Sequence, residues 1–379
     1  MKYGLVLAGG GARGAYQIGV WRALKEMKIN ITAISGASIG AVNGALFAQG
    51  DYKKAEELWR GISMEDIVAL PDGIRNTDNL FAIKNIAEIL KEVYKNNGLD
   101  MSPLEKLLNT VIDERKLRKS PVDFGIATFS VTKKNGVCKF KADIPEGEIV
   151  SYIMASACLP GFRMKEVERE KFLDGAVFNN MPVDMMIEKD VDNIITVDVK
   201  GIGVYKDTNL AGRNVISIKC TEPKTGIMGF DNEGIERSIS DGYIGCLKAF
   251  GRLTGDVYAF KNDDYTKARM QYSKELISGI EKAAKAFGIP NSRIYRIDEL
   301  ISLTMESYFA YTRKTNLNIK ENPLDIIRQA DDAMFIAMIV KMLESGKNDF
   351  ITEKMSILGS NYEAASSILY FKRQKSYCI

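Results

Sequence analysis

The chain has 379 residues, of which 46% are hydrophobic and 27% charged, so it can bury a large core and is not a disordered polymer. Its 52 basic and 49 acidic side chains leave a formal net charge of only +3, which argues against nucleic acid as its main partner. It contains no histidine, and its five cysteines show no C-x-x-C spacing, so we expect no metal site and no cofactor.

Membrane and export signals are weak along the chain. The first segment, MKYGLVLAGGG, has one lysine and a short apolar run before its glycines, unlike a secretory signal peptide. No window reaches the roughly 20 apolar residues of a membrane span. The best one, AMFIAMIVKML (333–343), contains Lys341 and predicts a buried or amphipathic helix. We therefore expect a cytoplasmic protein without a transmembrane segment, which meets a membrane only from its surface.

Strand and helix patterns alternate in the first 50 residues, and such alternation predicts a parallel sheet covered by helices. The expected elements are a strand at 3–8, a helix at 15–27, a strand at 31–35 and a helix at 39–49. Residues 51–120 then have mainly helical patterns, with a looser stretch at 70–79 where Pro, Gly, Asp and Asn cluster.

The next segments return to strands. VDFGIATFSVT and VCKFKAD predict a β-hairpin, because Asn135-Gly136 between them suits a turn with positive φ. A helix at 148–159, stopped by Pro160-Gly161, precedes a strand, a polar loop and a helix within KFLDGAVFNNMPVDMMIEK. The last core strands are expected at 193–199 and 214–220.

Helical patterns dominate beyond about residue 255. We therefore expect a first domain over 1–255 and a helical C-terminal region over 256–379, either packed on the core or forming a small domain. The sequence assigns this region no role and indicates no oligomeric state. The basic runs ERKLRKS (114–120) and FKRQK (371–375) suit solvated surface better than docking patches.

The first strand ends in a glycine loop, Gly9-x-Gly11-x-x-Gly14, which has two interpretations. Its helix start carries free N–H groups that favour a negative group, either a phosphate or the oxyanion of an acyl transfer. A dinucleotide site calls for an acidic residue closing the second strand, about 20 residues on. The second strand ends in AISGAS, without that acid, so the oxyanion is favoured.

Gly36-Ala37-Ser38-Ile39-Gly40 follows the second strand and has the G-x-S-x-G pattern of a serine nucleophile on a strand-to-helix elbow. Its flanking glycines are expected to allow the sharp bend. The alternative is that Ser38 is only a helix N-cap. Because the chain has no histidine, a nucleophilic Ser38 needs another base. Asp174 is the candidate, since it ends a short apolar strand, although an ordinary D-G turn would also explain it.

Four motifs in order resemble the patatin-like phospholipases of the bacterial type over roughly residues 3 to 220. They are G-G-G-A-R-G (9–14), G-A-S-I-G (36–40), A-S-A-C-L-P-G-F (155–162) and D-G-A with a following N-N-x-P (174–182). The resemblance implies a three-layer α/β/α sandwich with a mainly parallel central sheet, and a Ser-Asp dyad that works without histidine. Ala176 is a variant that the family accepts beside glycine.

The resemblance also implies roles for individual residues. Ser38 is the expected nucleophile and Asp174 the expected general base and acid. The backbone of Gly10, Gly11 and Ala12, with Arg13 alongside, is expected to form the oxyanion hole. The motif glycines are Gly9, Gly14, Gly36, Gly40 and Gly175.

The implied activity is hydrolysis of fatty-acyl esters of phospholipids or lysophospholipids through an acyl-enzyme, in lipid catabolism. The expected partner is a lipid substrate, with transient contact at the membrane surface. A triacylglycerol lipase or acyltransferase with the same dyad is the main alternative, and a non-enzymatic lipid- or nucleotide-binding protein is another. Apolar segments such as 151–162 and 333–343 suit core packing or an acyl channel, and residues 60–100 suit a cover over the site.

Overall fold

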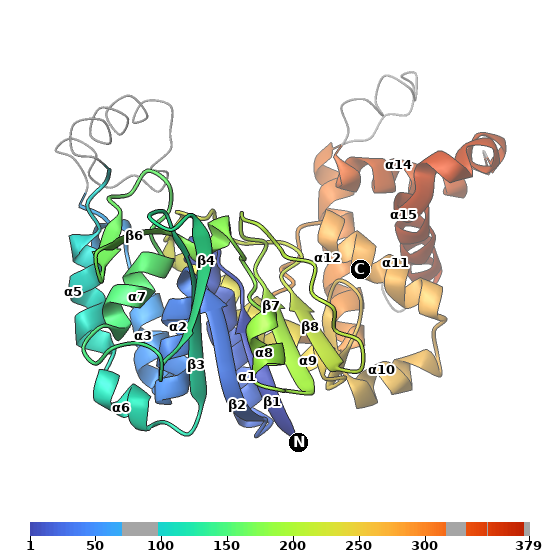
Figure 1. Cartoon of the computed structure of the whole chain (residues 1–379). Helices are drawn as coiled ribbons and strands as arrows, with labels where there is room; N and C mark the ends of the chain where they lie inside the picture. The colour runs from blue at the N-terminus through green and yellow to red at the C-terminus, as the bar shows by residue number, and fades with distance from the viewer. Residues whose placement is uncertain (70–97, 316–330, 347, 375–379) are drawn as a thin grey trace. The chain divides into compact units, whose positions relative to one another are not determined.

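The computed structural model describes residues 1–69, 98–315, 331–346 and 348–374 (Figure 1). The chain divides into two compact units, Met1–Phe250 and Gly251–Ile379. The looser stretch predicted at 70–79, and most of the cover predicted at 60–100, lie outside the described residues.

A mixed sheet forms the centre of the first unit. Within the described residues it has eight strands, in the order β5-β6-β3-β2-β1-β7-β8, with β4 beside β3. Five strands run parallel, while β4, β5 and β6 join antiparallel, so the predicted α/β fold with a mainly parallel sheet is confirmed. The strands are β1 (Lys2–Leu7), β2 (Asn30–Ala37), β3 (Asp123–Ser130), β4 (Asn135–Phe140), β5 (Lys165–Val167), β6 (Glu170–Leu173), β7 (Asn193–Asp198) and β8 (Asn214–Lys219).

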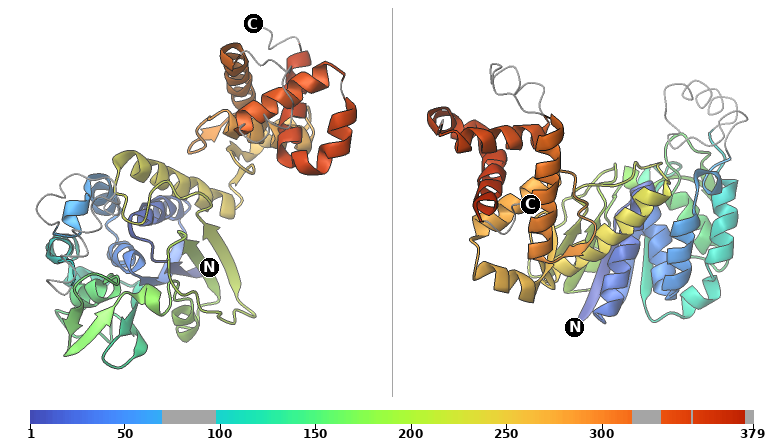
Figure 2. Two further views of the ribbon diagram at one scale, coloured as in Figure 1. Left: turned by 90° about the horizontal axis from the view of Figure 1, so that it is seen from above. Right: turned by 180° about the vertical axis from the view of Figure 1, so that it is seen from behind.

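Helices cover both faces of this sheet, as a three-layer sandwich requires. Most of them lie on one face, where Figure 2 shows α9 beside α1. The other face carries the short helix α8, whose Met185 and Met186 pack in one cluster with Val6 and Ile194 of the sheet. The helices are α1 (Ala15–Glu26), α2 (Ile39–Gln49), α3 (Tyr52–Gly61), α5 (Ser102–Val111), α6 (Glu114–Lys119), α7 (Ile149–Ser156), α8 (Asp184–Glu188) and α9 (Asn232–Ala249).

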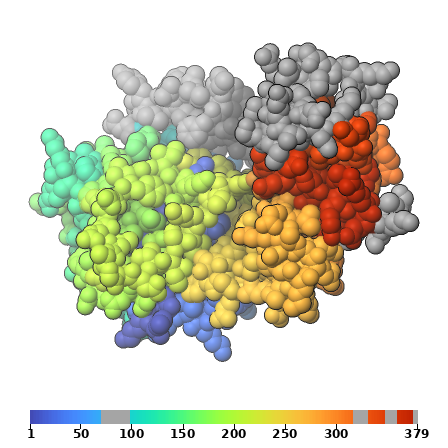
Figure 3. Space-filling model, turned by 90° about the vertical axis from the view of Figure 1, so that its right-hand side faces the viewer, coloured from blue at the N-terminus to red at the C-terminus, as the bar shows by residue number. Residues whose placement is uncertain are grey.

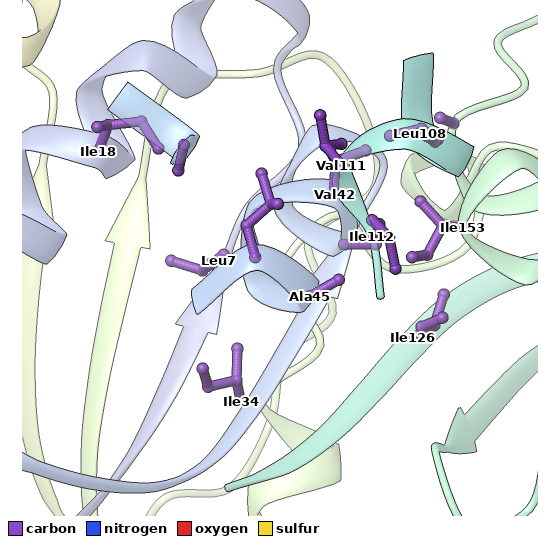
Figure 4. Close-up of a cluster of buried hydrophobic side chains, with 14 of the residues drawn as sticks. Leu7, Ile18, Ile34, Val42, Ala45, Leu108, Val111, Ile112, Ile126 and Ile153 are labelled. Atoms are coloured by element: carbon purple, nitrogen blue, oxygen red, sulfur yellow. The ribbon is translucent and has the colours of Figure 1, made fainter. Parts of the chain in front are cut away.

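Helix α2 has the bounds expected from sequence and is buried on nearly all sides. Its run of small and aliphatic residues lets it lie between the sheet and the outer helices, because a helix that is apolar all round suits a core position. Figure 4 shows its Val42 and Ala45 in one buried cluster with Leu7, Ile34, Ile126, Leu108 and Ile153. This helix starts directly after Ser38, so its packing fixes where that serine lies.

The predicted β3–β4 hairpin forms, but the reason given for its turn is wrong. Positive φ falls on Lys134, at 55°, whereas Asn135 and Gly136 already belong to β4. Gly136 pairs with Phe129, and a Cβ added there would lie 2.1 Å from the ring of Phe178. The glycine is therefore explained by close packing against an aromatic ring, not by turn geometry.

The second unit is mainly helical, as predicted, but it also contains a small sheet of order β11-β10-β9 that the sequence did not indicate. Its strands have only two or three residues, too few to show a periodic pattern. The elements are β9 (Leu253–Thr254), β10 (Ala259–Lys261), α10 (Asn262–Arg269), α11 (Lys274–Ala286), β11 (Ile294–Tyr295), α12 (Ile297–Thr315), α14 (Asp332–Glu344) and α15 (Asn348–Arg373).

Two buried features hold the second unit together. The carboxylate of Glu281 in α11 accepts the backbone N–H groups of Val257 and Tyr258, at 2.7 and 2.8 Å. Segment 333–343 forms most of α14 and is buried along one side with Lys341 exposed, which confirms the predicted buried or amphipathic helix. Helices α11 and α14 both pack against α15, and the residues of this unit are orange to red in Figure 3. In the described parts of the chain, no helix is long and apolar enough to cross a membrane.

Helices α1 and α9 cross at a pair of glycines. A Cβ on Gly19 would lie 1.8 Å from the carbonyl oxygen of Ile239, and one on Gly242 would lie 1.9 Å from that of Tyr16. The two backbones are therefore in contact, and any larger residue must separate the helices.

We predict that Gly242→Ala lowers the free energy of unfolding of the first unit by about 1–3 kcal/mol, because its methyl group has no space. Urea unfolding followed by tryptophan fluorescence reports on this unit alone, since the chain's two tryptophans are Trp21 and Trp59. Gly61→Ala is the matched control, because nothing lies within 4 Å of its added Cβ. Equal effects of the two substitutions would contradict the close crossing.

Candidate active site

Ser38 is the single residue between β2 and α2, and its backbone carries the strain of the turn. Its φ and ψ are 53° and −127°, a region that a residue with a Cβ rarely occupies. The flanking glycines were expected to make the bend, but neither has positive φ. They are needed for space, because a Cβ on Gly36 would lie 2.3 Å from Gly40 O, and one on Gly40 would lie 2.1 Å from Leu7 O.

A buried serine from α7 holds the backbone of Ser38 in this conformation. The Ser38 amide donates to Ser156 Oγ at 2.9 Å, and that hydroxyl donates to the carbonyl of Ala127 in β3 at 2.6 Å. Ser156 belongs to a motif noted in the sequence, but its role was not foreseen. The sequence gives little indication of this role, because a serine at a helix end has many possible hydrogen-bond partners.

Asp174 reaches the same place from the opposite direction. Ala37, the last residue of β2, pairs with Ala127, while Leu173, the last residue of β6, pairs antiparallel with Phe129. β2 and β6 thus lie on opposite sides of β3 and end on either side of Thr128. Ser38 follows β2 and Asp174 follows β6, so the two residues come together there. Asp174 directly follows a short strand, as the sequence indicated, and this strand, β6, joins the sheet antiparallel to β3.

The Asp174 carboxyl is completely buried. Its Oδ1 accepts the Ala176 amide at 2.7 Å, while Oδ2 has no hydrogen-bond partner among the described residues. Burial raises the pKa of Asp174 to about 7, and the nearby Ser38 hydroxyl and the Ala176 amide oppose that rise. The Ser38 hydroxyl is thus close enough to stabilise the carboxylate, without a hydrogen bond of normal geometry to Oδ2. A carboxyl with this pKa can accept a proton near neutral pH.

The glycine loop after β1 forms a short 3-10 helix, η1 (Gly11–Gly14), and leaves two amides free. Within the described residues, the N–H groups of Gly10 and Gly11 donate no hydrogen bond, and both residues line the cavity that contains Ser38. Ala12 was an expected third donor, but its amide donates to Ile227 O at 2.8 Å. The oxyanion donors that the geometry can supply are therefore Gly10 and Gly11.

Gly11 has a φ of 57°, and a Cβ there would lie 2.1 Å from Ile227 O. Arg13 lies alongside, as expected, but its guanidinium donates to the carbonyls of Thr225 and Lys200. Arg13 therefore ties the loop to two later segments and is not aimed at the free amides.

A family model described as patatin-like phospholipase matches residues 5–187, which contain Ser38, Asp174 and the glycine loop. Residues 5–187 belong to the patatin-like phospholipase family. The recognition made from the motifs is confirmed, while the bacterial type remains a prediction.

Individual relatives are similar over limited lengths. Patatin-like phospholipase domain-containing protein 7 of Mus musculus is 27% identical over 198 residues, which are 52% of this chain and 13% of that protein. Lysophospholipase nte1 of Aspergillus terreus is 63% identical over 46 residues, 12% of this chain and 3% of that protein. The chain thus spans 13% or less of the length of these curated relatives.

Among solved structures, VipD from Legionella pneumophila aligns over 97% of this chain and 88% of its own, with 14% identity and a TM-score of 0.43.

Asn180 holds the glycine loop through hydrogen bonds to Gly9. Its carbonyl accepts the Gly9 amide at 3.1 Å, and its side-chain amide donates to Gly9 O at 3.3 Å and to the Tyr205 hydroxyl at 3.0 Å. The sequence showed Asn180 in the N-N-x-P motif without a role. Only the fold brings it beside a loop 171 residues earlier in the chain.

A buried polar network joins the ends of the same loop to the elbow helix. Gln17 donates to Ala8 O at 2.7 Å, Asn43 donates to Gly14 O at 3.0 Å and to Gln17 Oε1 at 2.8 Å, and Trp59 donates to Asn43 Oδ1 at 2.8 Å. Because all three side chains are buried, losing one partner would leave a costly unpaired group. The network keeps the glycine loop and Ser38 in one fixed arrangement.

Two cavities of the first unit meet at Ser38. The wide one has a volume of about 920 Å³ and contains Ser38, Asp174 and the glycine loop. The narrow one, of about 60 Å³, shares Ser38 and Gly11 and extends among apolar side chains of α3 and α5, including Leu58, Trp59, Leu104 and Leu108. In the described residues, no three carboxylates or cysteines converge as they would to hold a metal ion.

We predict that Asp174→Asn stabilises the first unit in a pH-dependent manner. An unfolded Asp has a pKa of about 3.9, so from about pH 4 to 7 the folded protein holds a proton that the unfolded chain has lost. Wild-type stability therefore falls as pH rises through this window, by about 4 kcal/mol for a pKa raised from 3.8 to about 7, and is level above it.

The asparagine of this variant cannot titrate, so the stability of Asp174→Asn minus that of wild type should grow from about pH 4 to 7 and then stay constant. Urea unfolding of both proteins at several pH values, followed by tryptophan fluorescence, measures this difference. Other titrating groups are shared and cancel. A difference that is the same at every pH would show that the Asp174 pKa is not raised.

Proposed function

We propose that this protein is a serine hydrolase of lipid acyl esters, with Ser38 as nucleophile and Asp174 as its general base. One observation carries the proposal: a backbone-strained serine lies beside a fully buried carboxyl whose pKa is raised to about 7. Elsewhere a serine of this kind is activated by histidine, which this chain lacks. The raised pKa makes the carboxylate a base suited to neutral pH.

The reaction follows from these positions. Ser38 Oγ attacks the ester carbonyl carbon while Asp174 takes its proton, and the Gly10 and Gly11 amides donate to the oxyanion that forms. The positive end of α2, which begins at Ile39, favours the same negative charge. Asp174 then protonates the leaving alcohol, and water attacks the acyl-serine by the same steps to release the fatty acid.

The shape of the two cavities supports a substrate with an apolar tail and a larger polar part. The narrow apolar pocket suits the acyl chain and the wide cavity suits the alcohol with its head group. The pocket has a volume of only about 60 Å³, so a long chain must displace lining side chains. Met101 and Met228 line it, and methionine adapts its shape readily.

The family name and the name lysophospholipase carried by a relative agree with phospholipids and lysophospholipids as substrates. We place the activity in a catalytic domain over residues 1–255 and assign no role to 256–379. Location in the cytoplasm with transient contact at a membrane surface remains part of the proposal.

The test is mass spectrometry of the products formed from vesicles that mix phospholipid, lysophospholipid and triacylglycerol, with water and a lipid alcohol as competing acceptors. We expect wild type to release free fatty acid from phospholipid or lysophospholipid, and Ser38→Ala and Asp174→Asn to release at least about a thousandfold less. Transfer to the lipid alcohol would indicate an acyltransferase. Full activity of either variant would remove that residue from the mechanism.

A further inference from the structure

Apolar side chains are exposed where the wide cavity opens. In the described part of the first unit, six large apolar side chains are well exposed. Four of them lie at position 177 or within 202–205: Val177, Ile202, Val204 and Tyr205. Ile202 is 79% exposed, Val204 49% and Val177 38%. Val177 and Ile202 also line the cavity that contains Ser38. Such a cluster on a protein surface usually marks a contact with another molecule.

These residues form one fixed surface, although they come from two segments. The Val204 amide donates to Ala176 O at 2.8 Å, and its carbonyl accepts the Asn180 amide at 2.6 Å. Gly201 lies against the glycine loop, since a Cβ there would be 1.9 Å from Gly9 O. We call Val177, Ile202 and Val204 the rim patch. It is held open to solvent by backbone hydrogen bonds, so its exposure is built into the fold.

Charges around the rim patch nearly balance. Asp198, Lys200, Lys206 and Asp207 flank it in the same segment, and Lys206 lies 3.9 Å from Asp184 and over the Phe178 ring. A surface that bound by charge would have an excess of lysines. The patch therefore suits burial of its aliphatic side chains in an apolar environment.

We propose that the rim patch inserts into a lipid surface and brings the mouth of the Ser38 cavity to that surface. This rests on the proposed function, because an acyl ester that lies in a bilayer has to leave it to reach Ser38. A lipid surface explains why the exposed apolar residues gather at this opening. The balanced charge means that binding comes from burial of aliphatic side chains and does not depend on anionic lipid.

Vesicle flotation with the full chain tests this, using Ser38→Ala so that no lipid is consumed and binding does not depend on hydrolysis. We expect this protein to float with phosphatidylcholine vesicles. Adding Val204→Asp should weaken the partition by about tenfold or more, because a charge replaces a buried aliphatic side chain. Adding Val204→Trp should strengthen it, since tryptophan favours the membrane interface.

Met270→Asp is the matched control, because Met270 is 81% exposed but does not belong to the rim patch, and it should leave binding unchanged. Unaltered tryptophan fluorescence shows that the first unit of Val204→Asp is folded, and an unaltered far-ultraviolet circular dichroism spectrum shows that Val204→Trp and Met270→Asp are folded. Raising the salt concentration should change binding by less than about twofold, and phosphatidylserine should not be required. A strong salt dependence or a need for anionic lipid would overturn insertion as the mode of binding.

Equal flotation of Val204→Asp and its parent would overturn the proposal. If the parent protein does not bind vesicles, the proposal is also overturned. In that case, a dimer that Val204→Asp dissociates would identify the patch as a protein contact. If wild type hydrolyses a water-soluble ester but does not bind vesicles, only this inference fails. If binding depends on the patch but no ester is hydrolysed, the inference stands and the proposed function fails.

Discussion

The buried carboxyl group of Asp174 lies beside the hydroxyl of Ser38, and much of the first unit holds it in that position. Asp174 has one oxygen bound to a backbone amide and the other without a partner in the described residues. Such a group is costly to ionise, and the structure keeps it in place through β6, which adds to β3 in the antiparallel direction. Burial thus gives this carboxyl a proton affinity near that of the histidine in Ser-His-Asp hydrolases.

The glycine loop follows β1 and Ser38 follows β2, so both approach Asp174 from the side of β3 opposite to β6. Their positions depend on buried polar contacts: Ser156 on the Ser38 amide, Asn180 on Gly9, and the Gln17–Asn43–Trp59 network between the helices. These side chains hydrogen-bond to backbone groups or to other side chains, and Trp59 also lines the narrow cavity. They are positioning residues, and they explain how a strained serine is kept in one conformation.

The motifs and the strand–helix alternation were readable in the sequence because they are local. Ser38, Asp174 and the bounds of α2 are examples, and the mainly parallel sheet followed from the same patterns. Contacts between distant segments were not readable. The amide of Ala12 is taken by Ile227, more than 200 residues later, and Gly136 is a glycine because the Phe178 ring lies against it. The strands of the second unit were too short to show a pattern.

The central claim is that Asp174 activates Ser38, and the pH dependence of covalent labelling tests it most directly. A fluorophosphonate should modify one residue, Ser38, located by peptide mass spectrometry. Its second-order rate constant should rise about tenfold per pH unit at acid pH and level off above a midpoint near 7, the pKa of Asp174, because the carboxylate must be free to take the proton. Asp174→Asn should lose both the rate and the midpoint. Labelling at another residue, or a rate that is the same from acid to alkaline pH, would contradict the account.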